Sequence, residues 1–177
     1  MVFDYYQKLT PPQQRVYRAS DQITLVRLND RESLIPVVAA LGTALAAAHR
    51  ANTQKVCQKL AQALSDDLKI RRLNVRVLSA RPHDSNGELH GMYEPRHGVK
   101  PGKITLWMRT ARQQRVVAFR TFLRTFLHEF GHHLDYELLK LADSFHTEGF
   151  FKRESSLFRQ LVPRKKTIRK PVQGRAD

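Results

Sequence analysis

A short stretch near residue 130, "HEFGH", combines two histidines and a glutamate at a spacing that suits metal chemistry. His128 and His132 are four residues apart, so on a helix their imidazoles lie on one face and can bind a single Zn²⁺. Glu129 lies about 100° around the helix from His128, which keeps its carboxylate beside the ion rather than on it. There Glu129 can act as the general base that takes a proton from a zinc-bound water, whose pKa the metal lowers to about 7.

A catalytic zinc site also needs a third protein ligand and an open fourth position. His146 is one candidate, because the chain between it and His132 is long enough to end the helix, reverse and return. Glu154 is the rival, since it falls on the inward stripe of a later helix, where a carboxylate needs a partner. That partner is either the metal or, as we favour, an arginine or a ring N–H. Glu148 is interpreted as a solvated acid in a loop or first helical turn.

Other residues of the same segment have supporting roles. His133 points about 100° away from His132, so it is expected to pack or to support the ligands rather than to bind the same ion. Asp135 either accepts a ring N–H from His132 or is a surface acid, and both interpretations stay open. Tyr136 is a weaker candidate for stabilising an oxyanion. Gly131 leaves room for a close packing partner or for the metal site.

The quoted motif, followed at this distance by "FHTEGFF", resembles the SprT-like and related minimal zincin metallopeptidases. Their pattern is HExxH, a dozen or so residues, and then a histidine followed four positions later by Phe or Trp. Here His146 is followed by Phe150. The resemblance implies a zinc-dependent peptidase in which the ion is bound by His128, His132 and His146, with Glu129 as general base.

The resemblance also implies a short sheet whose edge strand lies over the active-site helix and aligns an extended peptide. We assign that role to "ITLWMRT", residues 104–110. The chain departs from the family in two respects, because it has no cysteine-rich ribbon at its C-terminus and its loop before His146 reads "ADSF". These departures weaken the transfer of biological role but leave the metal chemistry intact.

The elements that position these residues follow from hydrophobic periodicity. Apolar residues spaced by three or four predict a long helix over residues 113–141, which carries the motif. Helices are also expected from Thr10 and Pro11 onward, at 33–49 and at 52–69, and an amphipathic segment at 150–161. Cys57 is interpreted as a packing residue of one of these helices.

Alternating residues predict three short antiparallel strands, at 73–80, 88–94 and 103–110, with an Asn-Gly turn at Asn86 before the second. The fold class is therefore α+β and minimal zincin-like, with helices backing a small, mostly antiparallel sheet. We expect a single domain over residues 1–162. The basic segment 163–177 has too little apolar surface to fold and is expected to be a flexible tail.

The chain is strongly basic, with 31 Lys and Arg against 16 Asp and Glu and a formal charge of +15. Such a charge is compatible with non-specific nucleic-acid binding through phosphates, with attraction of acidic protein substrates, or simply with a solvated surface. The apolar run at 34–48 is too short to cross a membrane. A single cysteine and the lack of a secretory pattern favour a cytoplasmic protein.

Three functions are compatible with these residues. The first is a zinc metallopeptidase acting on protein or peptide substrates. The second is a basic nucleic-acid- or partner-binding protein whose zinc site is structural or inactive. The third is a metal hydrolase acting on another bond, because HExxH specifies an activated water more firmly than the bond attacked.

Overall fold

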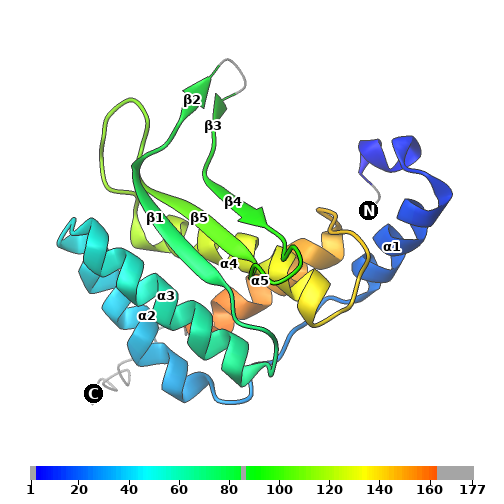
Figure 1. Ribbon diagram of the computed structural model, residues 1–177, viewed down its shortest axis with the longest axis horizontal. Coiled ribbons are helices and arrows are strands. Elements are labelled where there is room, and N and C mark those ends of the chain that lie inside the picture. Colours follow the sequence, from blue (N-terminus) through cyan, green and yellow to red (C-terminus); the bar gives the residue numbers. More distant parts are fainter. Residues whose placement is uncertain (1–2, 85–86, 163–177) are drawn as a thin grey trace, which may run out of the picture.

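The computed structural model describes residues 3–84 and 87–162, and this part of the chain folds as five α-helices around a small mixed sheet (Figure 1). In chain order the elements are η1 (Asp4–Lys8), α1 (Pro11–Gln22), α2 (Arg31–Ala46), α3 (Arg50–Asp67), β1 (Asn74–Ala80), β2 (His83–Asp84), β3 (Gly87–Glu88), β4 (Gly91–Glu94), β5 (Lys103–Arg109), α4 (Phe119–Glu137) and α5 (Glu148–Leu161). The α+β class predicted from the sequence is confirmed.

The predicted helices are present, and the largest change of boundary is in the helix that carries the motif. α1 begins at Pro11 behind a capping box between Thr10 and Gln13, as a proline at the first helical position predicts. α4 is shorter than the predicted segment 113–141. Its expected first turns instead extend the sheet, because the Val117 N–H donates to the carbonyl of Met108 at 2.9 Å.

The sheet differs from the prediction in both direction and order. β5 is the central strand, with β1 parallel to it on one side and β4 antiparallel on the other. The expectation of a mostly antiparallel sheet was therefore wrong for β1, and residues 104–110 are not an edge strand. Alternating hydrophobicity could not reveal this, because side chains alternate in the same way in parallel and antiparallel strands. The buried run from Ile104 to Met108 is the sign of a central strand.

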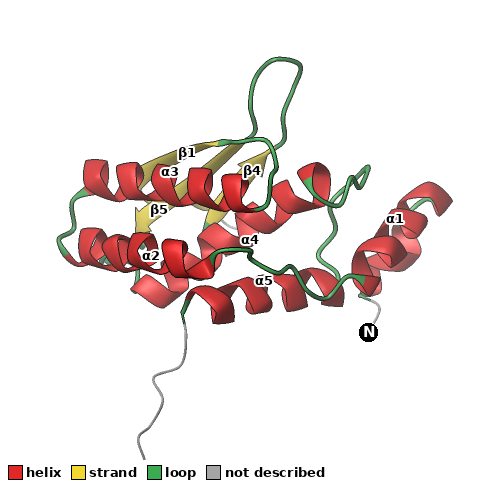
Figure 2. Cartoon of the chain, turned by 90° about the horizontal axis from the view of Figure 1, so that it is seen from below, coloured by secondary structure: helices red, strands yellow, loops and turns green. Residues whose placement is uncertain are grey.

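The two edges of the sheet have different surroundings. At the β1 edge, the Val75 N–H donates to Gln58 Oε1 at 2.7 Å, and the Gln58 amide donates to the carbonyl of Leu73 at 3.0 Å. Gln54 accepts the N–H of Val77 in the same way at 3.1 Å. α3 therefore covers the β1 edge with side-chain hydrogen bonds, whereas β4 is the edge that lies beside α4 (Figure 2).

One apolar cluster joins the helices to the inner face of the sheet, and Cys57 is fully buried within it, as predicted. Within the described residues, no helix has the length and apolar character needed to cross a bilayer. β2 and β3 pair antiparallel across the predicted turn, although Asn86 itself lies outside the described residues. The segment 163–177 lies outside them as well.

The start of α5 packs directly on the end of α1. The Gly149 N–H donates to Asp21 Oδ1 at 2.9 Å, and a Cβ placed on Gly149 would lie 2.4 Å from the Asp21 carbonyl oxygen. Because the obstacle is backbone, it cannot rotate away. Glycine at this position is therefore required by the close approach of the two helices.

We expect Gly149→Ala to lower the free energy of unfolding by about 2 kcal/mol or more, as overpacking does in close-packed sites. Gly42→Ala is the matched control, since its Cβ would meet Phe119 at an ordinary 3.5 Å in the interior of α2. The control should be neutral or stabilising by about 0.5–1 kcal/mol. Urea denaturation of the two variants measures both changes, and equal stabilities would contradict the required close approach.

Candidate metal centre

Three histidines converge where α4 meets the loop that follows it. α4 presents His128 and His132 on one face, and the loop between α4 and α5 brings His146 against them. His146 Nε2 lies 2.9 Å from His128 Nε2 and 3.1 Å from His132 Nε2. Their possible ligand atoms all lie within 4.8 Å of one another, so one ion can contact all three.

Two of the three separations in this cluster are close to those around a tetrahedral zinc ion. Zn–N bonds of about 2.0–2.1 Å separate neighbouring ligand nitrogens by about 3.3 Å. The two shorter Nε2 separations are within a few tenths of an ångström of that value. The donor set, three imidazole nitrogens without a thiolate, is typical of catalytic rather than structural zinc sites.

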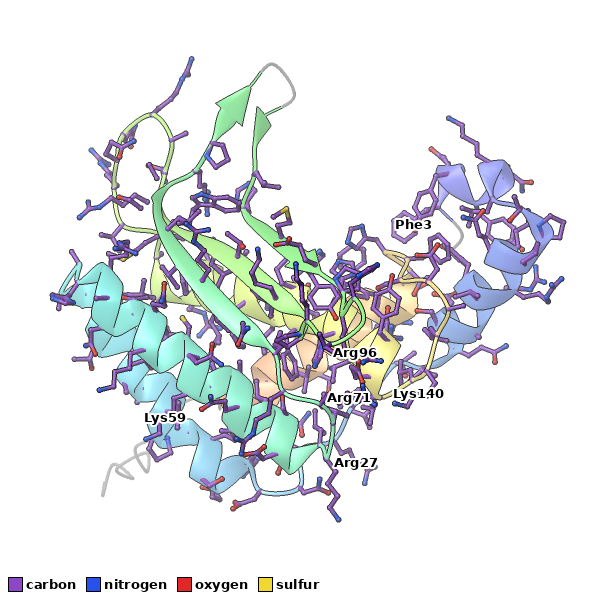
Figure 3. The ribbon with its side chains drawn as sticks, viewed as in Figure 1. Phe3, Arg27, Lys59, Arg71, Arg96 and Lys140 are labelled. Atoms are coloured by element: carbon purple, nitrogen blue, oxygen red, sulfur yellow. The ribbon has the colours of Figure 1, made fainter. Side chains whose placement is uncertain are left out.

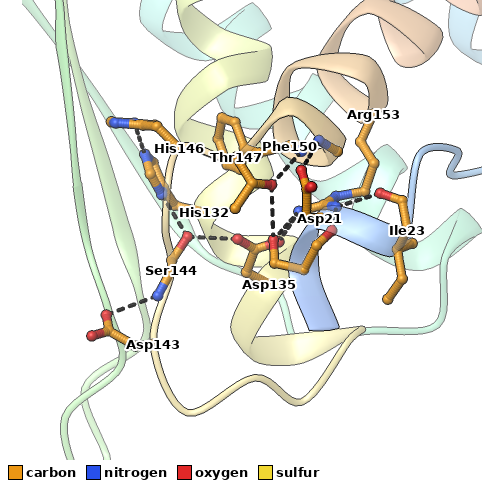
Figure 4. Close-up of polar contacts among 12 residues, drawn as sticks. Asp21, Ile23, His132, Asp135, Asp143, Ser144, His146, Thr147, Phe150 and Arg153 are labelled. Atoms are coloured by element: carbon orange, nitrogen blue, oxygen red, sulfur yellow. Dashed lines mark hydrogen bonds and ion pairs between the residues drawn. The ribbon is translucent and has the colours of Figure 1, made fainter. Parts of the chain in front are cut away.

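Hydrogen bonds fix the ring tautomers of the two helical histidines. The His128 Nδ1 lies 3.2 Å from Glu154 Oε2, so it carries the proton and leaves Nε2 with its lone pair. The His132 Nδ1 lies 2.7 Å from Ser144 Oγ, whose own proton goes to Asp135 Oδ2 at 2.7 Å. Ser144 must therefore accept from His132, which again leaves Nε2 free for a metal (Figure 4).

The electrostatics of the cluster favour the neutral form of His132 and His146. Burial, together with the neighbouring His146 and His128, lowers the pKa of His132 to about 3. Burial and the charge of His128 lower the pKa of His146 as well, against an opposing effect of Glu154. A neutral imidazole is the form that binds metal, so the lowered pKa values of His132 and His146 favour metal binding at ordinary pH.

Asp135 is fully buried and pairs with Arg153, whose guanidinium Nη2 lies 2.7 Å from Asp135 Oδ1. Arg153 also donates to the carbonyl of Ser20 at 2.7 Å and to that of Ile23, at the end of α1. Neither sequence interpretation of Asp135 was correct, because it supports His132 through Ser144 rather than directly and is not at the surface. A chain of hydrogen bonds thus runs from His132 to the N-terminal helix (Figure 4).

The Phe150 ring packs against all three imidazoles. Its ring centroid lies 5.1, 4.8 and 5.3 Å from those of His128, His132 and His146. Gly131 makes this possible, because a Cβ at that position would lie 3.0 Å from the Phe150 ring. The room expected at Gly131 is therefore taken by a packing partner.

Glu129 lies next to His128 and beneath β4. Its side chain is nearly buried under β4, where burial raises its pKa to about 7 against the lowering effects of His128 and of a backbone hydrogen bond with Tyr93. A Cβ on Gly91 would lie 2.5 Å from Glu129 Oε1. Glycine in the edge strand is thus what allows β4 to lie this close to the carboxylate.

The remaining candidates lie outside the ion-binding cluster. Glu154 has both of the partners favoured from the sequence, since Arg124 lies 3.3 Å from Oε1 and the His128 ring is at Oε2. His133 is buried and bridges the Arg71 carbonyl at 2.7 Å and the Tyr93 hydroxyl at 3.0 Å, so it packs as predicted. Glu148 is in the first turn of α5, as expected.

Tyr136 contacts a neighbouring ring rather than one of the three clustered imidazoles. It stacks on Tyr93 with their ring centroids 6.1 Å apart. Its predicted role in stabilising an oxyanion stays a prediction.

A cavity of about 380 Å³ opens beside the cluster, between β4, α4 and α5. Its lining includes His128, Glu129, Arg124 and Glu154. A water molecule or a small polar group can therefore reach Glu129 and the first histidine.

Comparison with known proteins found no match to a family model, to a curated protein or to a solved structure. The family resemblance therefore rests on the motif residues themselves.

Sequence reasoning missed Ser144 and Arg153. The loop "ADSF" was noted only as a departure from the family, although its serine is the partner of His132. Arg153 had a readable signal, because it falls three residues after Phe150 and four before Leu157 on the buried stripe of α5. A cation on such a stripe requires a buried acid, and Asp135 is that acid.

We expect Ser144→Ala to weaken zinc affinity by about 10- to 100-fold, because His132 loses the partner that fixes its tautomer. The overall fold should be retained, since Ser144 lies in a loop. Ser155→Ala, in α5, is the control and should bind zinc as the parent does. Competition with a chromogenic chelator measures both affinities, and an unchanged affinity in Ser144→Ala would contradict this role.

A second prediction concerns the metal-free protein and pH. The raised pKa of Glu129 means that the folded state holds this proton up to about pH 7, so ionisation of Glu129 destabilises the fold above its unfolded-state pKa. The stability of Glu129→Gln relative to the parent should therefore rise by about 3 kcal/mol between pH 4 and pH 8. Denaturation at the two pH values, with chelator present, measures the difference. A pH-independent difference would show that Glu129 is not buried as described.

Proposed function

We propose that this chain is a zinc-dependent metallopeptidase of the minimal zincin type, similar to the SprT-like enzymes. The observation that carries the proposal is the convergence of His128, His132 and His146, together with a cavity that is lined by His128 and by the neighbouring Glu129. Three ligands with an open side are the arrangement of catalytic zinc sites.

Glu129 moves the protons in the proposed reaction. A bound Zn²⁺ supplies a water of lowered pKa and polarises the substrate carbonyl. Glu129 accepts a proton from that water at its carboxylate as the water oxygen bonds to the carbonyl carbon. The same carboxyl then donates the proton to the amide nitrogen as the C–N bond breaks. In the metal-free protein, burial raises the pKa of this carboxyl to about 7, and a raised pKa assists a group that must carry a proton between two atoms.

β4 is the proposed guide for an extended peptide. The hydrogen bond between the Tyr93 backbone and Glu129 places the Tyr93 N–H on the side of β4 away from β5. In an antiparallel pair the N–H and C=O of one residue share a side, and residues two apart have the same orientation. Gly91 therefore offers its backbone groups at the open edge. Such pairing binds peptides with little demand on side chains.

A second candidate function, a nucleic-acid- or partner-binding protein with a structural zinc site, requires a fourth protein ligand. Within residues 3–84 and 87–162, the group able to hold one ion consists of the three histidines. Glu154, the rival ligand, has its oxygens occupied by Arg124 and His128. This favours the peptidase. Nucleic-acid association through the basic surface stays a separate prediction.

The decisive variant is Glu129→Gln, which keeps the size of the side chain but cannot accept a proton. It should reduce cleavage of unfolded casein by about 100-fold or more while the protein retains one zinc ion. Glu148→Gln is the control, because Glu148 pairs with Lys152 at 2.7 Å in the first turn of α5 and should not affect the rate. Cleavage by Glu129→Gln at the parental rate, with zinc bound, would refute the mechanism.

A further inference from the structure

The N-terminal arm, residues 3–9, reaches the metal centre from the side opposite β4. Figure 1 shows η1 and α1 beyond the loop that joins α4 to α5, with β4 on the other side of that loop. The Tyr5 hydroxyl donates to the carbonyl of His146 at 2.9 Å, and the Phe3 N–H donates to the Tyr17 hydroxyl at 3.2 Å. A hydrogen bond therefore links the arm to the backbone of His146.

Aromatic rings connect the arm to the metal ligand without interruption. Phe151 stacks on the His146 ring with centroids 5.8 Å apart, Phe3 meets Phe151 edge-on at 6.1 Å, and Tyr5 stacks on Phe3 at 6.1 Å. We call Phe3, Tyr5 and Phe151 the aromatic wall. Figure 3 shows Phe3 on the side of the arm that faces the rest of the molecule.

The wall is open to solvent although its rings are apolar. Phe151 is 39% exposed, and Phe3 and Tyr5 are half-buried. The preceding residue, Phe150, is by contrast only 1% exposed, because its ring packs against the three imidazoles. Exposed rings gathered beside a site are typical of ligand-binding surfaces.

The cavity that adjoins the cluster at His128 has a different chemistry. The cavity beside His128 is lined by Arg124, Glu129 and Glu154, of which Arg124 and Glu154 form an ion pair. The cluster thus adjoins charged groups at His128 and aromatic rings at His146. Two surroundings of different polarity give the site a basis for choosing between side chains.

We infer that the aromatic wall is a specificity subsite that takes an aromatic or large aliphatic side chain of the peptide substrate, next to the bond that is cleaved. The inference rests on the proposed function and adds a substrate preference to it. Ring-on-ring contact and removal of apolar surface from water supply the selectivity. The His146 ring belongs to the same stack, which places the bound side chain beside the metal.

The test uses two small zinc ligands on the zinc-loaded full-length chain, acetohydroxamic acid and phenylacetohydroxamic acid. Both bind metal through the same group, and only the second carries a ring. The parent should bind the phenyl compound about tenfold more tightly or better, the range expected of an apolar subsite. Phe151→Ala and Phe3→Ala should reduce this ratio to about twofold, with little change for acetohydroxamic acid.

Val99→Ala is the control, since Val99 is fully exposed in the turn between β4 and β5 and should leave the ratio unchanged. Cleavage of peptides that differ only by Phe or Ala beside the cleaved bond should show the same loss of preference in kcat/KM. An undiminished ratio in both wall variants would overturn the subsite while leaving the peptidase intact. Failure of both hydroxamates to bind, with no cleavage sensitive to Glu129→Gln, would instead refute the proposed function and the subsite with it.

Discussion

The buried ion pair between Asp135 and Arg153 is the interaction on which the metal centre depends. It joins α4 to α5, and through the carbonyls of Ser20 and Ile23 it joins both to the end of α1. Removing one partner of such a pair strands a buried charge, at a cost of about 3–5 kcal/mol. Because Asp135 also accepts the proton of Ser144, the same pair sets the orientation of His132.

The sheet contributes to the site through its asymmetry. With β5 in the centre, the chain has one edge covered by the glutamines of α3 and another edge, β4, directly over the carboxyl group of Glu129. Two glycines permit close contacts at the site. The lack of a side chain at Gly91 lets β4 approach Glu129, and the lack of one at Gly131 lets the Phe150 ring pack against α4. The spacing around the histidine cluster therefore depends on how closely these two glycines let neighbouring elements approach.

Local periodicity in the sequence predicted which side chains share a face of α4 and α5. Helical spacing was enough to place His128 beside His132, to turn His133 away and to require a partner for Glu154. It could not predict the parallel pairing of β1 with β5, because alternation is the same in both directions and the choice depends on how α3 packs. The hydrogen bond between His132 and Ser144 could not be predicted either, since it depends on the path of a loop that no periodic pattern describes.

The contact between the end of α1 and the start of α5 has a consequence for biosynthesis. Ser20 and Arg153, which it joins, are separated by 133 positions in the chain. During translation His128 and His132 are synthesised before Arg153, so the contact of Arg153 with residues 20–23 forms only after both are present. The hydrogen bonds that run from Arg153 through Asp135 and Ser144 to His132 are therefore completed late in folding.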